Sequence, residues 1–188
     1  MGDAANLTDH FLIAMPAMED PNFARTVAYV CQHTAEGAMA LVINRPAGFV
    51  LGDILDELEL APANADVAAT PVLLGGPVQA ERGFILHEPD GRAWDSSFEV
   101  SDGMTVTTSR DMLVAIAAGR APPRMLFALG YAGWDAGQLE RELLDNAWLT
   151  VPADRQTAFD LPADRRWQAA INLVGFDFTQ LSGQAGHA

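Results

Sequence analysis

The clearest pattern of hydrophobic and polar positions lies near the start of the chain, where two β-favouring runs flank a turn. Residues 26–33 and 38–44 are rich in apolar, aromatic and β-branched side chains, and residues 34–37 supply a four-residue turn that ends in glycine. Because side chains alternate across a strand, one face of the first run carries Val27, Tyr29 and Cys31. The other face is also apolar, so the pattern predicts a hairpin covered at least partly on both sides.

Shorter patterns predict further strands and helices. Helical spacing of apolar residues, with caps or glycine stops, predicts helices over residues 52–60, after Ser109, after Asp135 and from Asp164 to Gly175. Short apolar runs between turn residues predict strands over residues 10–14, 71–74, 83–87, 94–100, 105–108, 125–129 and 148–151. Short elements in irregular alternation favour an α+β fold with a mixed or antiparallel sheet over a doubly wound fold.

Composition adds that the chain is one folded unit. With 188 residues, 49% hydrophobic and 19% charged, it has enough apolar side chains for a sizeable core. No linker divides it, so we expect a single domain over residues 1–188. The ends, residues 1–8 and 180–188, are polar and poorly patterned, and we expect them to be loosely held.

The charge narrows the classes of partner and mechanism. The formal net charge is −14, which disfavours direct binding to DNA or to anionic membrane surfaces. All eleven basic residues are arginine, so mechanisms that need a lysine, such as a Walker A loop or a Schiff base, are excluded. The single cysteine, Cys31, the lack of an apolar membrane span and the lack of a signal-like N-terminus indicate a cytoplasmic protein.

Several candidate binding residues stand where strands end. Arg45, in Asn44-Arg45-Pro46, can aim its guanidinium at a carboxylate or phosphate, or else pair with a surface acid. Gly75-Gly76-Pro77 can leave backbone N–H groups free to cradle an anion, although a tight turn that needs positive φ is the simpler explanation. Arg82 belongs to the neighbouring string Arg82-Gly83-Phe84.

Other candidates suit acid–base chemistry or a pocket wall. His87 ends a strand, and Glu88 beside it can orient its imidazole, although backbone hydrogen bonding explains a strand-end histidine equally well. Trp134 can wall a pocket at the start of a helix, and Gln138 either joins that pocket or completes a capping box. The histidines are too dispersed for a metal site, and we expect no metal and no cofactor.

Two weaker signals favour structural roles. Cys31 and His33 lie two residues apart on a strand and so share a face, as a thiolate–imidazole pair requires, but a cysteine in mid-strand is usually a core residue. Arg165-Arg166, opposed by nearby acidic residues, indicates a solvated helix face rather than a nucleic-acid patch.

These strings, in their order along the chain, resemble the bacterial YqgE/AlgH family. The resemblance extends from Phe11-Leu12-Ile13-Ala14-Met15-Pro16 through Ile43-Asn44-Arg45-Pro46, Gly75-Gly76-Pro77-Val78 and Tyr131-Ala132-Gly133-Trp134 to the final Ala185-Gly186-His187-Ala188. It implies a compact α+β fold whose sheet folds partly back into a barrel. It also implies a cytosolic bacterial protein from a family without a settled activity, some of whose members are labelled transcriptional regulators.

Three functions stay open at this point. The first is a regulatory or adaptor protein that contacts a protein partner or a small anionic ligand through the surface around Asn44, Arg45, Gly75, Gly76, Arg82, His87, Trp134 and Gln138. The second is a hydrolase or transferase that uses His87 as base and Arg45 as electrostatic clamp, for which spacing supplies no complete catalytic set. The third is direct DNA binding, which the negative charge opposes and for which no helix-turn-helix with a basic face can be found.

Overall fold

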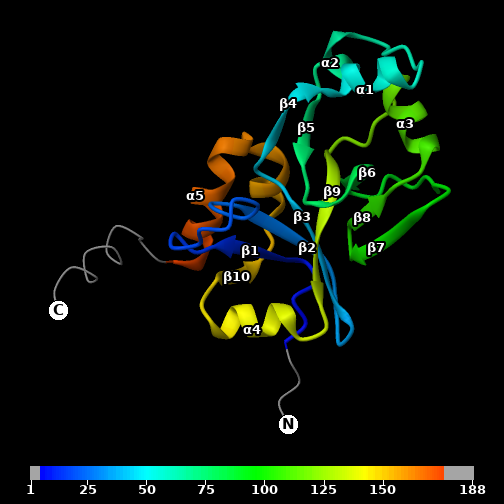
Figure 1. The fold of residues 1–188 in the computed structure, drawn as a ribbon. Helices are drawn as coiled ribbons and strands as arrows, with labels where there is room; N and C mark the ends of the chain where they lie inside the picture. The colour runs from blue at the N-terminus through cyan, green and yellow to red at the C-terminus, as the bar shows by residue number, and fades with distance from the viewer. Residues whose placement is uncertain (1–4, 176–188) are drawn as a thin grey trace.

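The computed structural model describes residues 5–175, and in that part of the chain ten strands form one mixed sheet (Figure 1). The main path runs β10-β1-β2-β3-β9-β6-β8-β7, while β5 pairs with β9 and β4 with β5. The β5–β9 pair is parallel and the other pairs are antiparallel. The strands are β1 His10–Ala14, β2 Val27–Thr34, β3 Gly37–Val42, β4 Pro46–Val50, β5 Pro71–Leu74, β6 Val78–His87, β7 Ser97–Ser101, β8 Met104–Thr107, β9 Met125–Asp135 and β10 Trp148–Pro152.

The helices lie at three places around this sheet. In Figure 1, α1, α2 and α3 gather at one end, α4 lies at the opposite end, and α5 lies against β1 and β10. None of these described helices is long and apolar enough to cross a membrane. They are α1 Leu51–Glu57, α2 Ala65–Ala68, α3 Arg110–Ala117, α4 Gln138–Leu144 and α5 Ala163–Val174, with a π-helical turn over Gln156–Asp160 before α5.

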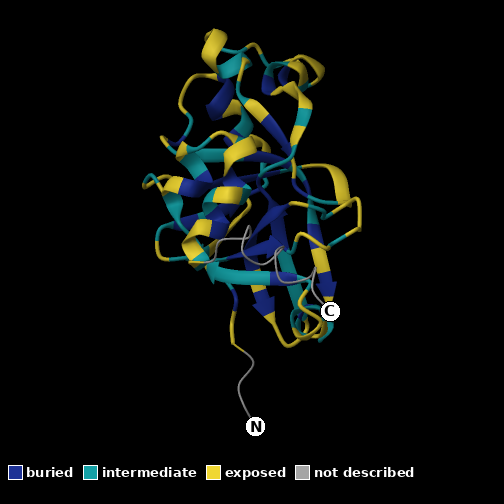
Figure 2. Ribbon diagram, turned by 90° about the vertical axis from the view of Figure 1, so that its left-hand side faces the viewer, coloured by how far each residue is buried: buried dark blue, intermediate teal, exposed yellow. Residues whose placement is uncertain are grey.

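The sheet curls into a half-barrel because its two faces bury different clusters. The inner cluster takes alternate residues of β1, β2 and β3, together with Leu73 and Leu86, and α5 closes it with Ala170 and Ile171. The outer face is covered in two parts, by α4 over β1–β3 and by α1 and α3 over β5, β6 and the first half of β9. Figure 2 shows the resulting layers, with buried strands in the middle and exposed outer surfaces. The α+β half-barrel implied by the resemblance is therefore confirmed.

Strand β9 connects the two halves of the sheet. Residues 125–129 pair with β5 and β6, whereas residues 132–135 pair with β3. The change of partner falls just after Gly130, whose φ of 74° is readily available only to glycine, and Tyr131 still pairs with Val78 of β6. Tyr131 to Trp134 therefore belong to this strand and not, as we expected, to a connection between a strand and a helix.

The predicted hairpin is confirmed, with one irregularity. In the pairing of β2 with β3, Val30 faces Ala40 but Gln32 faces Met39, so β2 carries an extra residue at Cys31. The bulge reverses the alternation beyond it. The turn is also tighter than expected, because Thr34 already pairs with Gly37.

The N-terminal segment is held more firmly than its polar sequence indicated. Leu7 is buried, its N–H donates to Nδ1 of His33 at 3.0 Å, and the Thr8 hydroxyl accepts from the His33 N–H. These contacts hold Leu7 and Thr8, whereas Ala5 and Asn6 are exposed. Residues 1–4 and the predicted loose end at 180–188 lie outside the described residues.

Candidate functional site

The side chains of Asn44 and Arg45 stabilise a neighbouring turn through hydrogen bonds. The side-chain oxygen of Asn44 accepts from the Val27 N–H at 2.8 Å, and its amide donates to the Arg25 carbonyl at 2.9 Å. The Arg45 guanidinium donates to the carbonyls of Asn22 and Ala24 at 2.7 and 3.0 Å. This arginine therefore binds backbone oxygens of its own chain, although no carboxylate neutralises it among the described residues.

Gly75 and Gly76 stand where β5 leaves the sheet and passes close to β9. A Cβ on Gly75 would lie 2.4 Å from the Gly130 carbonyl oxygen, and one on Gly76 would lie 2.1 Å from the Tyr131 carbonyl carbon. The Gly75 N–H donates to Leu129, and its carbonyl accepts from Val42. The pair allows two backbones to touch, and the Gly75 N–H is already used within the sheet.

Arg82, Trp134 and Gln138 lie in separate surroundings. The Arg82 guanidinium reaches Gln79 and Thr108 and lies 5.6 Å from the centre of the Phe84 ring. Trp134 is 5% exposed and stacks on Phe23 at 6.0 Å.

Gln138 accepts from the Asp135 N–H at 3.0 Å, but α4 begins at Gln138 and its N-cap is Gly137, so the two residues do not form the expected capping box. The hollow of about 530 Å³ beside Trp134 is lined by none of the other seven predicted residues. The structure therefore does not bring the eight residues to one cavity, and their binding role stays a prediction.

His87 is buried with both ring nitrogens engaged. Nδ1 lies 2.9 Å from the Glu88 carbonyl oxygen and Nε2 lies 2.7 Å from the Thr107 hydroxyl. Nδ1 therefore carries the proton, and Nε2 accepts from the hydroxyl. Burial lowers the pKa of His87, which favours this neutral form.

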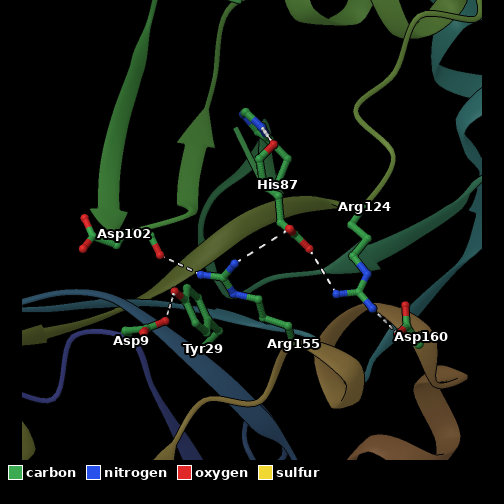
Figure 3. A network of polar contacts seen from close by, with 8 residues as sticks. Asp9, Tyr29, His87, Asp102, Arg124, Arg155 and Asp160 are labelled. Carbon is green, nitrogen blue, oxygen red and sulfur yellow. Dashed lines mark hydrogen bonds and ion pairs between the residues drawn. The ribbon is translucent and has the colours of Figure 1, made fainter. Parts of the chain in front are cut away.

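The carboxylate of Glu88 does not orient the His87 ring. The carboxylate instead forms ion pairs with Arg124 and Arg155, which are labelled in Figure 3. It lies 3.2 Å from Arg124 and 3.7 Å from Arg155, and Arg124 also binds Asp160 at 2.5 Å. The expected polarising contact between Glu88 and the imidazole is absent, since only the backbone of Glu88 meets the ring.

The bulge in β2 separates Cys31 from His33. Cys31 packs in the inner cluster, where burial raises the pKa of its thiol, and its Sγ lies 3.6 Å from the Tyr29 carbonyl. His33 turns to the outer face and donates from Nε2 to Glu140 at 2.6 Å. The expectation that the two share a face is therefore wrong, because the extra residue shifts the alternation by one.

A groove that the sequence did not reveal lies between α1 and α3, over β6 and β9. We call it the α1–α3 groove. Its volume is about 560 Å³, within the range of about 300–1,000 Å³ common for ligand pockets. It is lined by Phe49, Asp53, Ile54, Glu57, Leu58, Ala80, Glu81, Gly83, Leu113, Phe127 and Leu129.

The floor of this groove is apolar and depends on a glycine. A Cβ on Gly83 would lie 2.9 Å from Cζ of Phe127, so the missing side chain makes room for the ring. Phe49 stands on the wall and is 40% exposed. An apolar floor with an exposed aromatic side chain is a surface that a partner can cover.

The rim of the α1–α3 groove is acidic. Asp53, Glu57 and Glu81 are exposed, and none of them forms an ion pair with a described residue. Arg110, which donates to the Leu58 carbonyl at 3.5 Å, is the nearby basic contact. The helix predicted over residues 52–60 contains Asp53 and Glu57, but the wall that α3 and β6 add depends on tertiary packing.

Comparison with known proteins gives relatives along the whole chain. A family model described as AlgH-like matches residues 11–179. A UPF0301 protein of Thioalkalivibrio sulfidiphilus is 53% identical over 188 residues, covering 100% of both chains. A UPF0301 protein of Burkholderia mallei is 51% identical and covers 99% of this chain and 97% of its own.

Two solved structures share the architecture. The solution structure of the AlgH protein from Pseudomonas aeruginosa matches with a TM-score of 0.79 and 49% identity, covering 100% of both chains. A crystal structure of a Corynebacterium diphtheriae protein matches with a TM-score of 0.71 over 92% of this chain and 89% of its own. At 18% identity the second likeness shows the fold alone.

Proposed function

The chain belongs to the AlgH-like family, and we propose that it is a cytoplasmic regulatory or adaptor protein whose α1–α3 groove binds an apolar, basic segment of a protein partner. The observation that carries this proposal is the combination of apolar floor and unpaired acidic rim in one groove. A single buried cysteine is in keeping with a reducing compartment.

The occupant follows from charge complementarity. Three rim carboxylates on a chain of net charge −14 attract lysine and arginine and repel acidic segments. Apolar side chains of the partner cover Phe49, Ile54 and Leu113, as in complexes where an amphipathic helix lies in a groove. Rim charges chiefly raise the association rate, whereas the apolar contacts hold the complex.

The test uses a defined probe. A fluorescein-labelled helical peptide, with leucine along one face and lysine on the others, is titrated with the protein and followed by anisotropy. A peptide of the same composition in scrambled order controls for charge alone. We expect saturable binding of the ordered peptide and at least roughly tenfold weaker binding of the scrambled one.

Matched variants locate the binding surface. Phe49→Ala removes a groove side chain that is 40% exposed, and Phe98→Ala removes a β7 side chain that is 37% exposed. The double variant Glu57→Lys/Glu81→Lys reverses the rim charge, and Glu36→Lys/Glu99→Lys makes the same net change elsewhere. The proposal is supported if peptide binding weakens in the groove variant of each pair and not in its control. It is refuted if the groove variant and its control have equal effects in both pairs.

A further inference from the structure

A second cavity, which shares Phe127 with the lining of the α1–α3 groove, lies where α5 begins. The strand ends of β4, β5 and β9 form one wall, and the segment from the π-helical turn into α5 forms the other. Its volume is about 340 Å³. Most of its lining is apolar, including Leu73, Met125 and Phe159, while the polar side chains are Thr70, Asp160 and Arg166.

Arg166 is the unusual member of this lining. The residue is 6% exposed, so the structure corrects the expectation of a solvated arginine. Its Nε donates to the Leu161 carbonyl at 3.1 Å and its Nη1 donates to the Ile43 carbonyl. Within the described chain, Nη2 makes no hydrogen bond and no carboxylate forms an ion pair with the guanidinium.

This arrangement leaves a positive charge uncompensated in an apolar setting. Burial lowers the pKa of Arg166, but the guanidinium stays protonated in proteins. Neutral carbonyls satisfy some of its N–H groups and cancel none of its charge. Buried charges in folded proteins are normally paired with an opposite charge, so the chemistry of this cavity suits an anion.

The surroundings favour an anion at this position. Pro162, the N-cap, and Ala163, the first residue of the twelve-residue helix α5, line the cavity, and the N-terminal end of a helix carries partial positive charge. The one carboxylate in the lining, Asp160, is bound to Arg124 at 2.5 Å. That ion pair reduces the repulsion between Asp160 and an incoming anion.

We propose that this cavity binds a small apolar monocarboxylate, with its carboxylate on Arg166 and its hydrocarbon body against Leu73, Met125 and Phe159. A single guanidinium matches one negative charge, and its planar fork can bind both carboxylate oxygens. Phosphate, with a larger charge and no apolar body, leaves the apolar walls uncovered.

The test measures binding of octanoate to the full chain by isothermal titration calorimetry, with neutral octanamide and inorganic phosphate as comparison probes. We expect saturable binding of octanoate and at least roughly tenfold weaker binding of octanamide. Arg166→Met is expected to weaken octanoate binding by a similar factor. Arg165→Met, at the exposed neighbouring position, is the matched control and leaves binding unchanged.

A steric variant keeps the test decisive if Arg166→Met does not fold. Met125→Trp fills the cavity while Arg166 stays in place, and it is expected to abolish octanoate binding. Unchanged affinity in Met125→Trp or in a folded Arg166→Met overturns the proposal. So does a lack of saturable octanoate binding to the wild type up to about 10 mM, or tighter binding of phosphate than of octanoate.

Discussion

Single residues in this protein show how a charged side chain can stabilise the fold instead of binding a ligand. Arg45 follows a strand, where a sequence pattern marks it as a ligand clamp, yet its guanidinium holds the carbonyls of Asn22 and Ala24. Those acceptors are backbone atoms 23 and 21 residues away, and backbone oxygens leave no signature in a sequence. The sequence therefore predicted that an arginine follows the strand, but it did not predict the hydrogen-bond acceptors of that arginine.

His87 provides a pH-dependent test at this scale. Its pKa is lowered in the fold by burial, so between the lowered value and about 6.5 the unfolded chain binds the proton and the folded chain does not. The free energy of unfolding must then fall as the pH drops through this window, by at most about 1.4 kcal/mol per pH unit. Urea unfolding at about pH 7.5 and 5.5 measures the loss.

The variant His87→Gln isolates this contribution. It removes the buried imidazole, and the difference in unfolding free energy between the two pH values is expected to shrink relative to the wild type. His10→Gln controls for the loss of any histidine, because His10 is partly exposed and its ring makes one hydrogen bond, to the Thr8 carbonyl. An unchanged pH dependence in His87→Gln would contradict the neutral buried imidazole.

At the scale of elements, the contact between the β5–β6 connection and β9 determines how the two halves of the sheet join. Gly75 and Gly76 touch Gly130 and Tyr131, where β9 changes partners. Gly130 itself has no room for a side chain, since a Cβ there would lie 2.3 Å from the Gly76 carbonyl oxygen. The glycines therefore allow two backbone segments to approach closely. The turn signal in the sequence predicts the turn but not this approach.

Alanine substitutions test this contact. Gly76→Ala is expected to lower the free energy of unfolding by about 3 kcal/mol or more, because its Cβ overlaps backbone that cannot move aside. Gly133→Ala, in β9, is the control: the nearest atom to the new Cβ, at 3.4 Å, belongs to a side chain, and a change within about 1 kcal/mol is expected. Chemical denaturation measures the free energy of unfolding of both variants. Equal values for the two variants would contradict the packing explanation.

The elements that the sequence predicted correctly are those that depend on residues close together in the chain. The β2–β3 hairpin follows from alternation and a nearby turn, and α5 ends at Gly175 as its positive φ requires. Strand β4 and the π-helical turn were missed, because β4 is mostly exposed and the π-helical turn has five residues, so neither repeats a pattern. The bulge at Cys31 was missed because one extra residue leaves no periodic mark.

For the whole molecule, the candidate sites depended on features that only tertiary structure supplies. The α1–α3 groove needs α1, α3 and two strands from separate parts of the chain. The cavity at Arg166 needs an arginine to be buried without a carboxylate, contrary to the usual behaviour of charged residues. Net charge and composition follow directly from the sequence. They indicate which classes of partner the protein can bind, but they do not locate a site.

The charge distribution leads to a prediction about DNA. Many of the eleven arginines are held within the chain: Arg45 and Arg166 bind carbonyls, Arg92 binds Asp90, and Arg124 and Arg155 bind Glu88. Such arginines are less available to phosphates, and the net charge of −14 repels the duplex. Anisotropy of a labelled duplex is therefore expected to show no saturable binding, even at about 50 mM salt.

This measurement separates direct regulators from indirect ones. Tight binding that weakens steeply with salt would mean that a local basic surface overrides the net charge, and direct DNA recognition would then have to replace the groove as the proposed function. A cationic helix-turn-helix protein on the same duplex serves as the positive control. Absence of binding, together with groove-dependent capture of the basic peptide, leaves contact with a protein partner as the route by which this acidic chain acts.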